Sequence, residues 1–438
     1  MLAANLIQKA LTSGKVAKLL RSKTAHAVGR LGVALSTCSP QNAYQREALA
    51  FVLKWTAASF VSKRPVVWTT AFLPSELSYS LNAIPFMPEL AAGVAAVAGI
   101  SPVALTAAQS QGYSSDLCSF HRCLVGLLGM ELLPRPDAVI TTNLMCDGGY
   151  RVLENLAAEI GVPHYHIDLP LGTTISAAEE DYVAGQLRET WERLKAQLYP
   201  STLQTDKRFW ELSLKRAMQE SAAATSYRLR INNLRKQKPG PWRGAEALSY
   251  VAMDLLAMGC QEGTAYFKAL ESSLAARVAS ATPAIPDETY RLIWLHLRPY
   301  TDAQLLNHIE LNWKALIAFN DYSYVHWAPP EPDKPWHSLA SRMLRHPSWG
   351  PAERRVALVL KLIKEYDADG VIQFDHWGCR QSTGMGSLLR QALRKNGIPF
   401  LELDGDCVDP RSASAGQHRS RVDAFMEVLE DAKTARRN

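Results

Sequence analysis

The chain lacks the cysteine patterns of the common zinc modules. None of its seven cysteines forms a CxxC pair, and no HxxxH pair accompanies them. Structural zinc in fingers and ribbons is bound by such closely spaced pairs, so we expect neither module here. The odd cysteine count and the absence of a secretory signal also argue against a disulfide framework. We therefore expect reduced cysteines and a cytoplasmic location.

Three further absences narrow the class of function. No P-loop of the form GxxxxGK[ST] occurs, so we expect no ATP hydrolysis by this chain. No apolar run reaches the ~20 residues that cross a bilayer, and the longest, residues 90–105, contains Pro102 and is expected to form a buried helix. The net charge of +6 is not gathered into a basic stripe. Neither a membrane nor a nucleic acid is expected as a partner.

The composition is typical of a folded protein with two domains. The 438 residues are 47% hydrophobic and 21% charged, which is enough apolar material for two full cores. Apolar runs alternate with helical patterns in two regions, which predicts an α/β fold with two flavodoxin-like, open-sheet domains facing a cleft. The expected order is a helical N-terminal segment, an α/β domain, a helical middle segment with a linker, and a second α/β domain, at residues 1–60, 61–200, 201–288 and 289–438.

Cysteines recur directly after predicted strands. Three of the apolar runs that predict strands, residues 137–142, 371–374 and 398–403, are each followed within a few residues by a cysteine. In open α/β sheets the loops after the carboxyl ends of the strands carry function. Five cysteines stand in turn contexts rich in glycine, aspartate or histidine: Cys118, Cys123, Cys146, Cys379 and Cys407.

Soft thiolates gathered from several loops are suited to an iron-sulfur cluster. Their scattered spacing matches no ferredoxin pattern, so structural thiols without a cofactor are an equally open interpretation. Cys38, in a polar stretch, and Cys260, at the end of a helical pattern, lie outside the turn contexts. We expect these two to play no part in a metal site.

Other residues near the cysteines could serve a cofactor. His121 and His376 adjoin candidate ligands, where each could donate a hydrogen bond to a cluster or fill the wall of the cleft. Gly378 precedes Cys379 in a short turn, and Gly384 lies at a predicted helix start whose free N–H groups could face an anion. A plain glycine turn is the alternative for Gly384.

Several segments together resemble the family of 2-hydroxyacyl-CoA dehydratase D-components, benzoyl-CoA reductase cluster subunits and double-cubane-cluster proteins. Each segment is short, but their order and spacing are specific, and the resemblance spans residues 60–430. The matching segments are residues 68–86, 117–122, 136–147, 167–170, 319–327, 376–380, 397–407 and 417–425.

The resemblance implies an oxygen-sensitive [4Fe-4S] cluster that is held by Cys118, Cys146 and Cys379, with Cys123 and Cys407 as additional candidates. A double cubane, which joins two cubanes through a sulfide and needs about six thiolates, stays an alternative. In the family, the segment around Glu76 approaches the substrate, so Glu76 and His376 are candidate catalytic residues. Glu76 could equally be a first-turn residue that offsets a helix dipole.

The resemblance also implies partners and a reaction. An ATP-hydrolysing iron-sulfur activator would deliver an electron, and a homodimer or a sister subunit would complete the enzyme. The substrate would be a 2-hydroxyacyl-CoA, dehydrated through a radical, or another CoA ester or small molecule that is reduced. Residues 295–300 depart from the dehydratase pattern, and residues 320–327 are closer to the double-cubane branch. A non-catalytic electron-transfer subunit of a larger complex is the further alternative.

Overall fold

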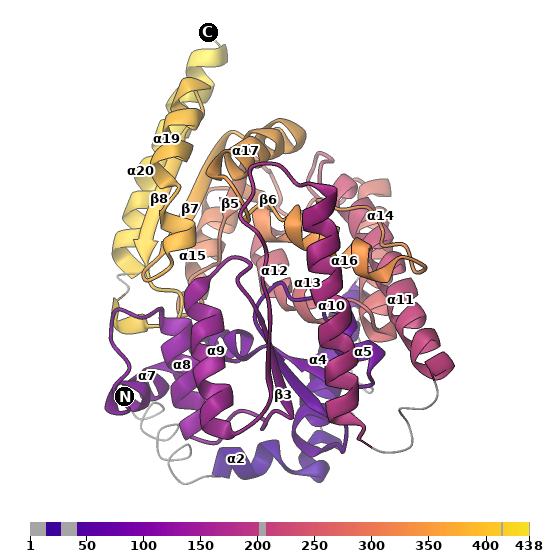
Figure 1. Ribbon diagram of the computed structural model, residues 1–438. Helices are drawn as coiled ribbons and strands as arrows, with labels where there is room; N and C mark the ends of the chain where they lie inside the picture. Colours follow the sequence, from indigo (N-terminus) through magenta and orange to yellow (C-terminus); the bar gives the residue numbers. More distant parts are fainter. Residues whose placement is uncertain (1–14, 28–41, 201–206, 413–414, 438) are drawn as a thin grey trace.

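Two four-stranded parallel sheets form the centre of the protein (Figure 1). The structure, a computed structural model, describes residues 15–27, 42–200, 207–412 and 415–437. The strand orders are β2-β1-β3-β4 and β6-β5-β7-β8, so the second sheet repeats the order of the first. The prediction of an α/β fold is confirmed, whereas the division into four domains stays a prediction.

The first sheet is built from short strands. Its central strands are buried along their whole length, whereas the edge strand β4 alternates half-buried His164 and His166 with buried residues. A parallel strand that is covered on both faces needs apolar residues at every position, and an edge strand does not. The strands are β1 (Val66–Thr69), β2 (Ile84–Phe86), β3 (Ala138–Thr142) and β4 (His164–Ile167).

The second sheet follows the same rule. Its strands β5 and β6 are buried throughout, and its edge strand β8 alternates buried residues with more exposed ones. A register irregularity lies between Leu292 and Ile293, where β5 pairs with β6. The strands are β5 (Tyr290–Leu295), β6 (Ala315–Asn320), β7 (Gly370–His376) and β8 (Phe400–Gly405).

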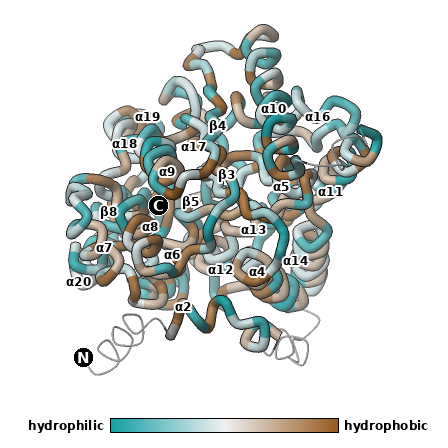
Figure 2. Tube along the Cα trace, turned by 60° about the horizontal axis from the view of Figure 1, so that its bottom comes forward, coloured by the Kyte–Doolittle hydropathy of each residue, from teal (hydrophilic) through white to brown (hydrophobic). Residues whose placement is uncertain are grey.

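Helices surround the first sheet. α9 packs on β3, α10 on β4, and α8 on α6 and α7. The long outer helix α10 alternates hydrophilic and hydrophobic residues along its length (Figure 2). These helices and the N-terminal ones are α2 (Lys15–Leu20), α4 (Ala43–Val61), α5 (Glu76–Ser80), α6 (Pro88–Val97), α7 (Ser101–Ser110), α8 (Ser119–Gly129), α9 (Asp147–Ile160) and α10 (Ala177–Leu198).

The apolar run at residues 90–105 forms two helices instead of the one predicted. Gly99 has a φ of +70°, which ends α6 in a left-handed turn. Pro102 stands at the start of α7, where the absence of a backbone N–H breaks no hydrogen bond of the helix. None of the described helices combines the length and the apolar character that a membrane crossing needs.

The remaining helices form a middle layer and cover the second sheet. α11 packs on α14, which packs on α4, while α12 contacts β6, α17 contacts β5 and α20 contacts β8. They are α11 (Lys207–Leu234), α12 (Gly244–Ser249), α13 (Val251–Leu256), α14 (Gln261–Ala279), α15 (Ala303–Asn307), π-helix η3 (His308–Asn312), 3₁₀-helix η4 (Asp321–Ser323), α16 (Pro335–Leu344), α17 (Ala352–Tyr366), α18 (Arg380–Thr383), α19 (Gly386–Lys395), 3₁₀-helix η5 (Pro410–Ser412) and α20 (Ala415–Arg437).

The two halves of the molecule share a hydrophobic core. One continuous cluster of buried side chains contains Trp68 and Val139 from the first sheet and Trp294 and Phe374 from the second. Phe120 of α8 belongs to the same cluster. The apolar contact that stabilises each sheet therefore also holds the two sheets together.

Candidate functional site

A mostly apolar cavity of about 110 Å³ lies between the two sheets. In each sheet the chain reverses its direction of strand addition, between β1 and β3 in the first and between β5 and β7 in the second. Such switch points open a crevice at the carboxyl ends of the strands. Residues that follow these four strands line the cavity: Phe72, Cys146, His296 and Cys379.

Three of the predicted ligands come together in this cavity. Cys118, Cys146 and Cys379 all line it. Each stands immediately before a helix, as the N-cap of α8, α9 and α18 respectively. The free N–H groups of a helix start favour negative charge, so they offset part of the cost of burying a thiolate at each of these positions.

The three thiols are near enough to influence one another. Burial raises the pKa of Cys118 well above its ordinary value, and the charges of Cys379 and Cys146 raise it further, although the amides of Phe120 and His121 oppose the shift. Burial likewise raises the pKa of Cys146 to about 11, with Cys379 contributing. A cationic centre among the thiols would remove this mutual repulsion and favour the thiolates.

The donor set fits a cluster better than a single ion. Among the described residues, no three histidine, cysteine or carboxylate side chains converge on one point as ligands of one metal ion would. In a cubane each iron takes its own thiolate, so the sulfur atoms stand apart. Three soft donors around one apolar cavity match that requirement.

His376, the last residue of β7, has its tautomer fixed by the backbone. The N–H of Cys407 donates to its Nδ1 at 3.0 Å, so the ring proton of the neutral imidazole must be on Nε2. Burial lowers the pKa of His376 to about 4, which keeps the ring neutral. Nε2 lies 3.2 Å from Sγ of Cys118, and the histidine therefore donates to the sulfur.

His296, the residue after β5, occupies the matching place beside Cys379. Its Nε2 lies 3.6 Å from Sγ of Cys379, and its ring stacks on His376 with centroids 6.4 Å apart. It has a φ of +71°, an uncommon backbone conformation for a residue with a side chain. Oδ1 of Asp321 accepts its backbone N–H at 2.9 Å, and Arg355 holds Asp321 in turn.

The sequence did not single out His296 as a site residue. A signal was present, because His296 follows a strand just as the cysteines do. Glu89, in the first turn of α6, was also missed, and it lines the cavity 3.8 Å from Nε2 of His121. Its position follows from how α6 packs on α8, which no local pattern reveals.

His121 and Gly378 both line the cavity, and their cofactor-binding role stays a prediction. His121 lines the cavity, and its Nδ1 has no hydrogen-bond partner within the described ranges. Gly378 has a φ of +77°, and a Cβ at this position would lie 2.9 Å from the Cα of Cys118. Only glycine therefore permits this close approach of the two loops. Gly384 lies between α18 and α19 and is not part of the cavity wall.

Glu76 lies outside the cavity wall. It is fully buried, and its carboxylate accepts two hydrogen bonds from Arg342, at 2.7 and 2.8 Å. Ser221 donates to it as well. Burial opposes ionisation, but the charge and hydrogen bonds of Arg342 outweigh burial and lower the pKa of Glu76. In this arrangement Glu76 ties α5 to α16, and its catalytic role stays a prediction.

The two additional candidate ligands, Cys123 and Cys407, lie away from the cavity wall. Cys123 and Cys407 are buried in the shared core and do not line the cavity. Burial raises the pKa of both, and the charges of Asp406, Cys118 and Cys379 raise that of Cys407 further. Whether either cysteine is a ligand stays a prediction. Cys38 lies outside the described residues.

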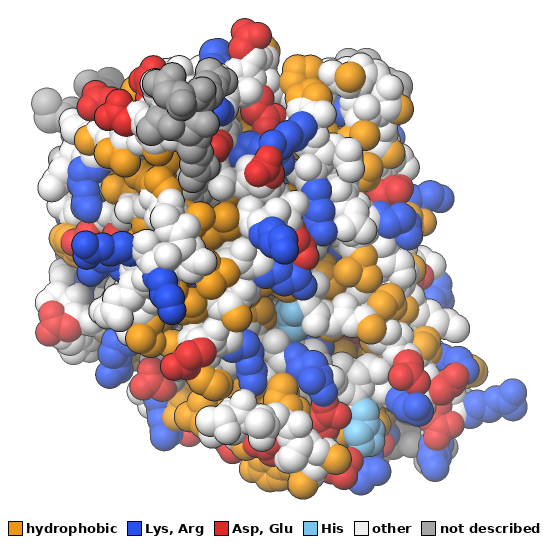
Figure 3. Space-filling model, turned by 90° about the horizontal axis from the view of Figure 1, so that it is seen from above, with side chains coloured by type: hydrophobic (Ala, Val, Ile, Leu, Met, Phe, Trp, Pro, Cys, Tyr) orange, Lys and Arg blue, Asp and Glu red, His pale blue; other side chains and the backbone are white. Residues whose placement is uncertain are grey.

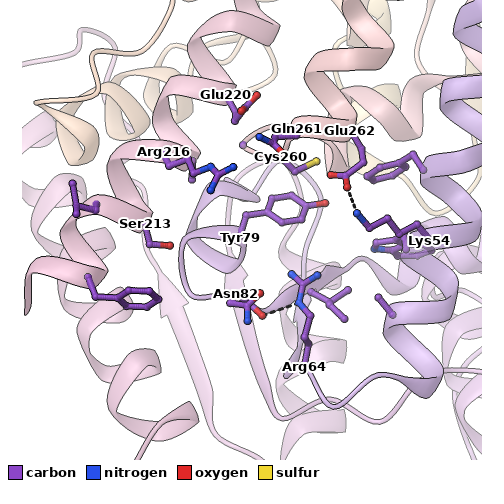
Figure 4. A pocket seen from close by; sticks show the side chains of 18 residues that line it. Lys54, Arg64, Tyr79, Asn82, Ser213, Arg216, Glu220, Cys260, Gln261 and Glu262 are labelled. Atoms are coloured by element: carbon purple, nitrogen blue, oxygen red, sulfur yellow. Dashed lines mark hydrogen bonds and ion pairs between the residues drawn. The ribbon is translucent and has the colours of Figure 1, made fainter. Parts of the chain in front are cut away.

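Cys260 lines a different cavity. This open groove of about 490 Å³ lies beside α4, α5 and α11, with Lys54, Arg64 and Arg216 around Tyr79 (Figure 4). It shares no lining residue with the cavity that holds the three thiols. That Cys260 is not a cluster ligand stays a prediction.

One face of the molecule is mixed in charge. Seen from above, lysine and arginine side chains lie among carboxylates and apolar atoms without forming a patch of one sign (Figure 3). Two side chains of the loop that carries Cys379 are exposed, Trp377 by 46% and Arg380, which pairs with Asp147 of the first half. This loop could therefore be reached by another protein.

Comparisons with known proteins give a consistent result. A family model described as 2-hydroxyglutaryl-CoA dehydratase, D-component, matches residues 70–429. The chain is 26% identical to the lactoyl-CoA dehydratase subunit alpha of Anaerotignum propionicum, over 83% of this chain and 90% of that protein. It is 26% identical to the (R)-2-hydroxyisocaproyl-CoA dehydratase alpha subunit of Clostridioides difficile, over 85% and 92%. It is also 21% identical to a benzoyl-CoA reductase subunit of Thauera aromatica, over 75% and 80%.

Proposed function

Because the chain belongs to the 2-hydroxyglutaryl-CoA dehydratase D-component family, we propose that it is an iron-sulfur enzyme which uses a low-potential electron to transform a substrate that is hard to reduce. The enzyme is of the dehydratase or reductase type, like its relatives. The reaction would be the radical dehydration of a 2-hydroxyacyl-CoA or the reduction of a related substrate. The single observation that carries the proposal is the convergence of Cys118, Cys146 and Cys379 on one mostly apolar cavity.

We propose that these three cysteines hold a [4Fe-4S] cluster. When bound, such a cluster supplies single electrons. The N–H groups at the starts of α8, α9 and α18 would offset the negative charge of the thiolates. His376 donates to Cys118, and His296 lies within reach of Cys379. The apolar wall would exclude water from the reacting centre.

For proton transfer, Glu89 and His121 are better placed than Glu76. Both line the cavity, and Oε2 of Glu89 is buried without a hydrogen-bond partner in the described part of the chain. Oε1 of Glu89 lies 3.8 Å from Nε2 of His121. Carboxyl and imidazole groups are common general acids and bases, and this pair could transfer a proton to or from a substrate in the same cavity. The carboxylate of Glu76 instead forms an ion pair with Arg342.

The proposal includes partners. The chain contains no P-loop, so the energy for charging the cluster would come from a separate ATP-hydrolysing iron-sulfur activator. The relatives are themselves named as single subunits of their enzymes, which favours a sister subunit or a second copy of this chain.

We also assign both α/β units to the flavodoxin-like class, and the shared strand order, 2-1-3-4 in each sheet, supports this.

A small-molecule reductase with a double cubane is the second candidate. It is favoured by the place of Cys407, whose backbone N–H donates to His376, the histidine that lies 3.2 Å from Sγ of Cys118. Cys407 could supply a further thiolate if the loop after β8 moved toward the cavity. A double cubane would still need additional ligands, because Cys123 lies on the buried side of α8.

Anaerobic purification tests the proposal. We expect a brown protein with iron and acid-labile sulfide, and an electron paramagnetic resonance (EPR) signal of a reduced [4Fe-4S] cluster after reduction. Iron and sulfide per chain separate one cubane from two. Protein that has never met air and contains zinc but no sulfide would contradict the assignment. Turnover with a panel of 2-hydroxyacyl-CoA esters, in the presence of activator and Mg-ATP, then separates dehydratase from reductase.

A further inference from the structure

A buried arginine without a partner lies in the middle helical layer. Arg235 directly follows α11 and is only 2% exposed. Its Nε and Nη2 have no hydrogen-bond partner among the residues that the structure describes, and no described carboxylate forms an ion pair with its guanidinium. A buried charge that is not compensated strongly destabilises a folded protein. Something beyond these residues is therefore needed beside Arg235.

The other deeply buried arginines show what Arg235 lacks. Three of them are no more than 4% exposed, and each pairs with a carboxylate at 3.1 Å or less: Arg228 with Asp254, Arg291 with Glu288, and Arg355 with Asp321. The fold thus supplies a carboxylate wherever it buries one of these three guanidinium groups. At Arg235 the negative charge has to come from elsewhere.

Aromatic rings compensate the charge of Arg235 only in part. Its Cζ lies 4.4 Å from the ring centroid of Phe319, in β6, and 5.3 Å from that of Trp242. A ring attracts a cation but is a poor acceptor for several N–H groups at once. Burial lowers the pKa of Arg235 to about 10, so the guanidinium still carries its charge at neutral pH.

A cavity of about 20 Å³ lies beside this arginine, and we name it the Arg235 cavity. Residues of α11, α12, α13 and α14 form most of its wall (Figure 1). Its charged lining residues are Arg228, Arg235 and Asp254. Asp254 is already paired with Arg228 and accepts a hydrogen bond from Ser323. The wall therefore carries one positive charge that is not neutralised.

Trp242 adds a further free donor to the same wall. It is 5% exposed and lines the Arg235 cavity, and within the described ranges its Nε1 has no partner. The buried side-chain atoms of this wall that lack a partner there are all N–H groups, on Arg235 and Trp242. A water molecule could accept from them, but it would also need acceptors for its own two protons. An anion only accepts.

We propose that the Arg235 cavity binds one small inorganic anion of the size of chloride. The anion accepts hydrogen bonds from the guanidinium of Arg235 and the indole of Trp242, and its charge neutralises the arginine. One water needs roughly 10–15 Å³, so the cavity has room for one small particle but not for sulfate or a carboxylate. It shares no lining residue with the cavity of the three thiols. The anion is thus structural and holds the end of α11 against β6.

Bromide tests the site directly, because it resembles chloride and scatters X-rays anomalously. Crystals of the full-length protein grown in sodium bromide should show an anomalous peak in the Arg235 cavity. In solution, thermal unfolding of the anaerobically purified protein is compared in sodium chloride and in sodium gluconate of equal ionic strength. Chloride should raise the melting temperature by about 1–2 °C at tenfold its Kd, and the rise should follow a saturation curve.

Two outcomes of these measurements would overturn the proposal. The first is a water molecule in the cavity at saturating bromide, with no anomalous peak. The second is an anomalous peak together with equal melting temperatures in chloride and gluconate, which would mean binding at crystal concentration only.

Variants identify the groups that hold the anion. Arg235→Met should abolish the bromide peak and the chloride dependence, and in gluconate it should be at least as stable as the wild type, because the unpaired charge is gone. Trp242→Phe keeps a ring but removes the N–H, so the chloride concentration for half of the effect should rise about tenfold. Arg230→Met, the same change at an exposed ion pair of α11, is the control and should keep the wild-type dependence.

The two site variants decide separately. An unchanged chloride dependence in Arg235→Met would overturn the proposal. If Arg235→Met does not fold, an unchanged dependence in Trp242→Phe would overturn it in the same way.

Discussion

At the scale of single residues, backbone contacts decide what the histidines can do. The N–H of Cys407 forces the proton of His376 onto the nitrogen that faces Cys118. An N–H donated to a thiolate draws negative charge from the sulfur and eases reduction of the attached cluster. With a cluster bound, a histidine at this position would set the potential of the cluster instead of transferring protons.

Replacement of His376 tests this role. His376→Leu removes the donor, so the midpoint potential of the cluster should become more negative by on the order of 60 mV, the equivalent of one hydrogen bond to a charged group. His376→Gln can still donate and should restore much of the difference. EPR-monitored redox titration measures the potential. His337→Leu changes an exposed histidine and serves as the control; an equal shift there would contradict the assignment.

Cysteine substitutions rank the ligands. Cys118→Ala, Cys146→Ala and Cys379→Ala should each abolish or strongly reduce the iron content, because loss of one of three thiolates leaves an iron without a protein ligand. Cys38→Ala and Cys260→Ala should keep the wild-type content, and Cys260 indeed lies in the separate groove. Iron and sulfide analysis of the anaerobic proteins gives the ranking, which equal loss in all five variants would refute.

At the scale of helices, the pair of Glu76 and Arg342 joins two elements far apart in the sequence. Glu76 begins α5 and Arg342 lies near the end of α16, and both carboxylate oxygens are hydrogen-bonded to the guanidinium. Arg342 also lines a cavity of about 50 Å³ that adjoins the cavity with the three thiols. The pair therefore fixes one wall of that cavity as well as the packing of α5.

Loss of the ion pair between Glu76 and Arg342 should lower the stability of the protein. Glu76→Gln leaves the buried guanidinium of Arg342 uncompensated and should lower the free energy of unfolding by about 3–5 kcal/mol at neutral pH. The lowered pKa of Glu76 means that its contribution is present above the carboxyl's ordinary pKa and is lost as pH falls through the folded value. The difference between wild type and variant should therefore shrink below pH ~4.5.

Urea unfolding at neutral and acidic pH measures this difference. The control is Glu180→Gln, whose carboxylate pairs with Arg345 near the surface and should contribute about 1 kcal/mol or less. A stability difference for Glu76→Gln that stays constant down to the acidic end would show that ionisation of Glu76 is not the cause.

The sequence predicted the elements better than their contacts. Parallel strands followed by Cys146 and Cys379 were readable, because buried strands are apolar runs and their ends are marked by polar turns. His296 and Glu89 were not identified, since their importance depends on which loops and helices meet in space. Glu76 was assigned from the resemblance, and its partner Arg342 is 266 positions away.

At the scale of the whole molecule, the site belongs to neither half alone. Cys118 and Cys146 come from the first half and Cys379 from the second, and the shared core lies beneath them. The loop with the exposed Trp377 is the part of the site most accessible to a partner. We expect the electron to enter from this side.

Dependence on an activator is the prediction at this scale. The isolated chain should show no ATPase activity, because it has no P-loop, and negligible turnover with reduced ferredoxin alone. Adding an iron-sulfur ATPase activator with Mg-ATP should start turnover, measured as substrate consumed under anaerobic conditions. Steady turnover of a CoA ester without ATP would show that no separate energy input is needed.

The contact of Gly378 with Cys118 has a mechanical consequence. Backbone from the second half touches backbone from the first at this point. A cluster bound by thiols of both halves would link the two halves at the same place. Destruction of the cluster by oxygen would then remove the link between the two halves as well as an electron carrier. The two sheets would be free to part, and amide hydrogens along the starts of α8, α9 and α18 would exchange faster with solvent. Oxygen sensitivity would in that case be a property of the architecture as much as of the iron.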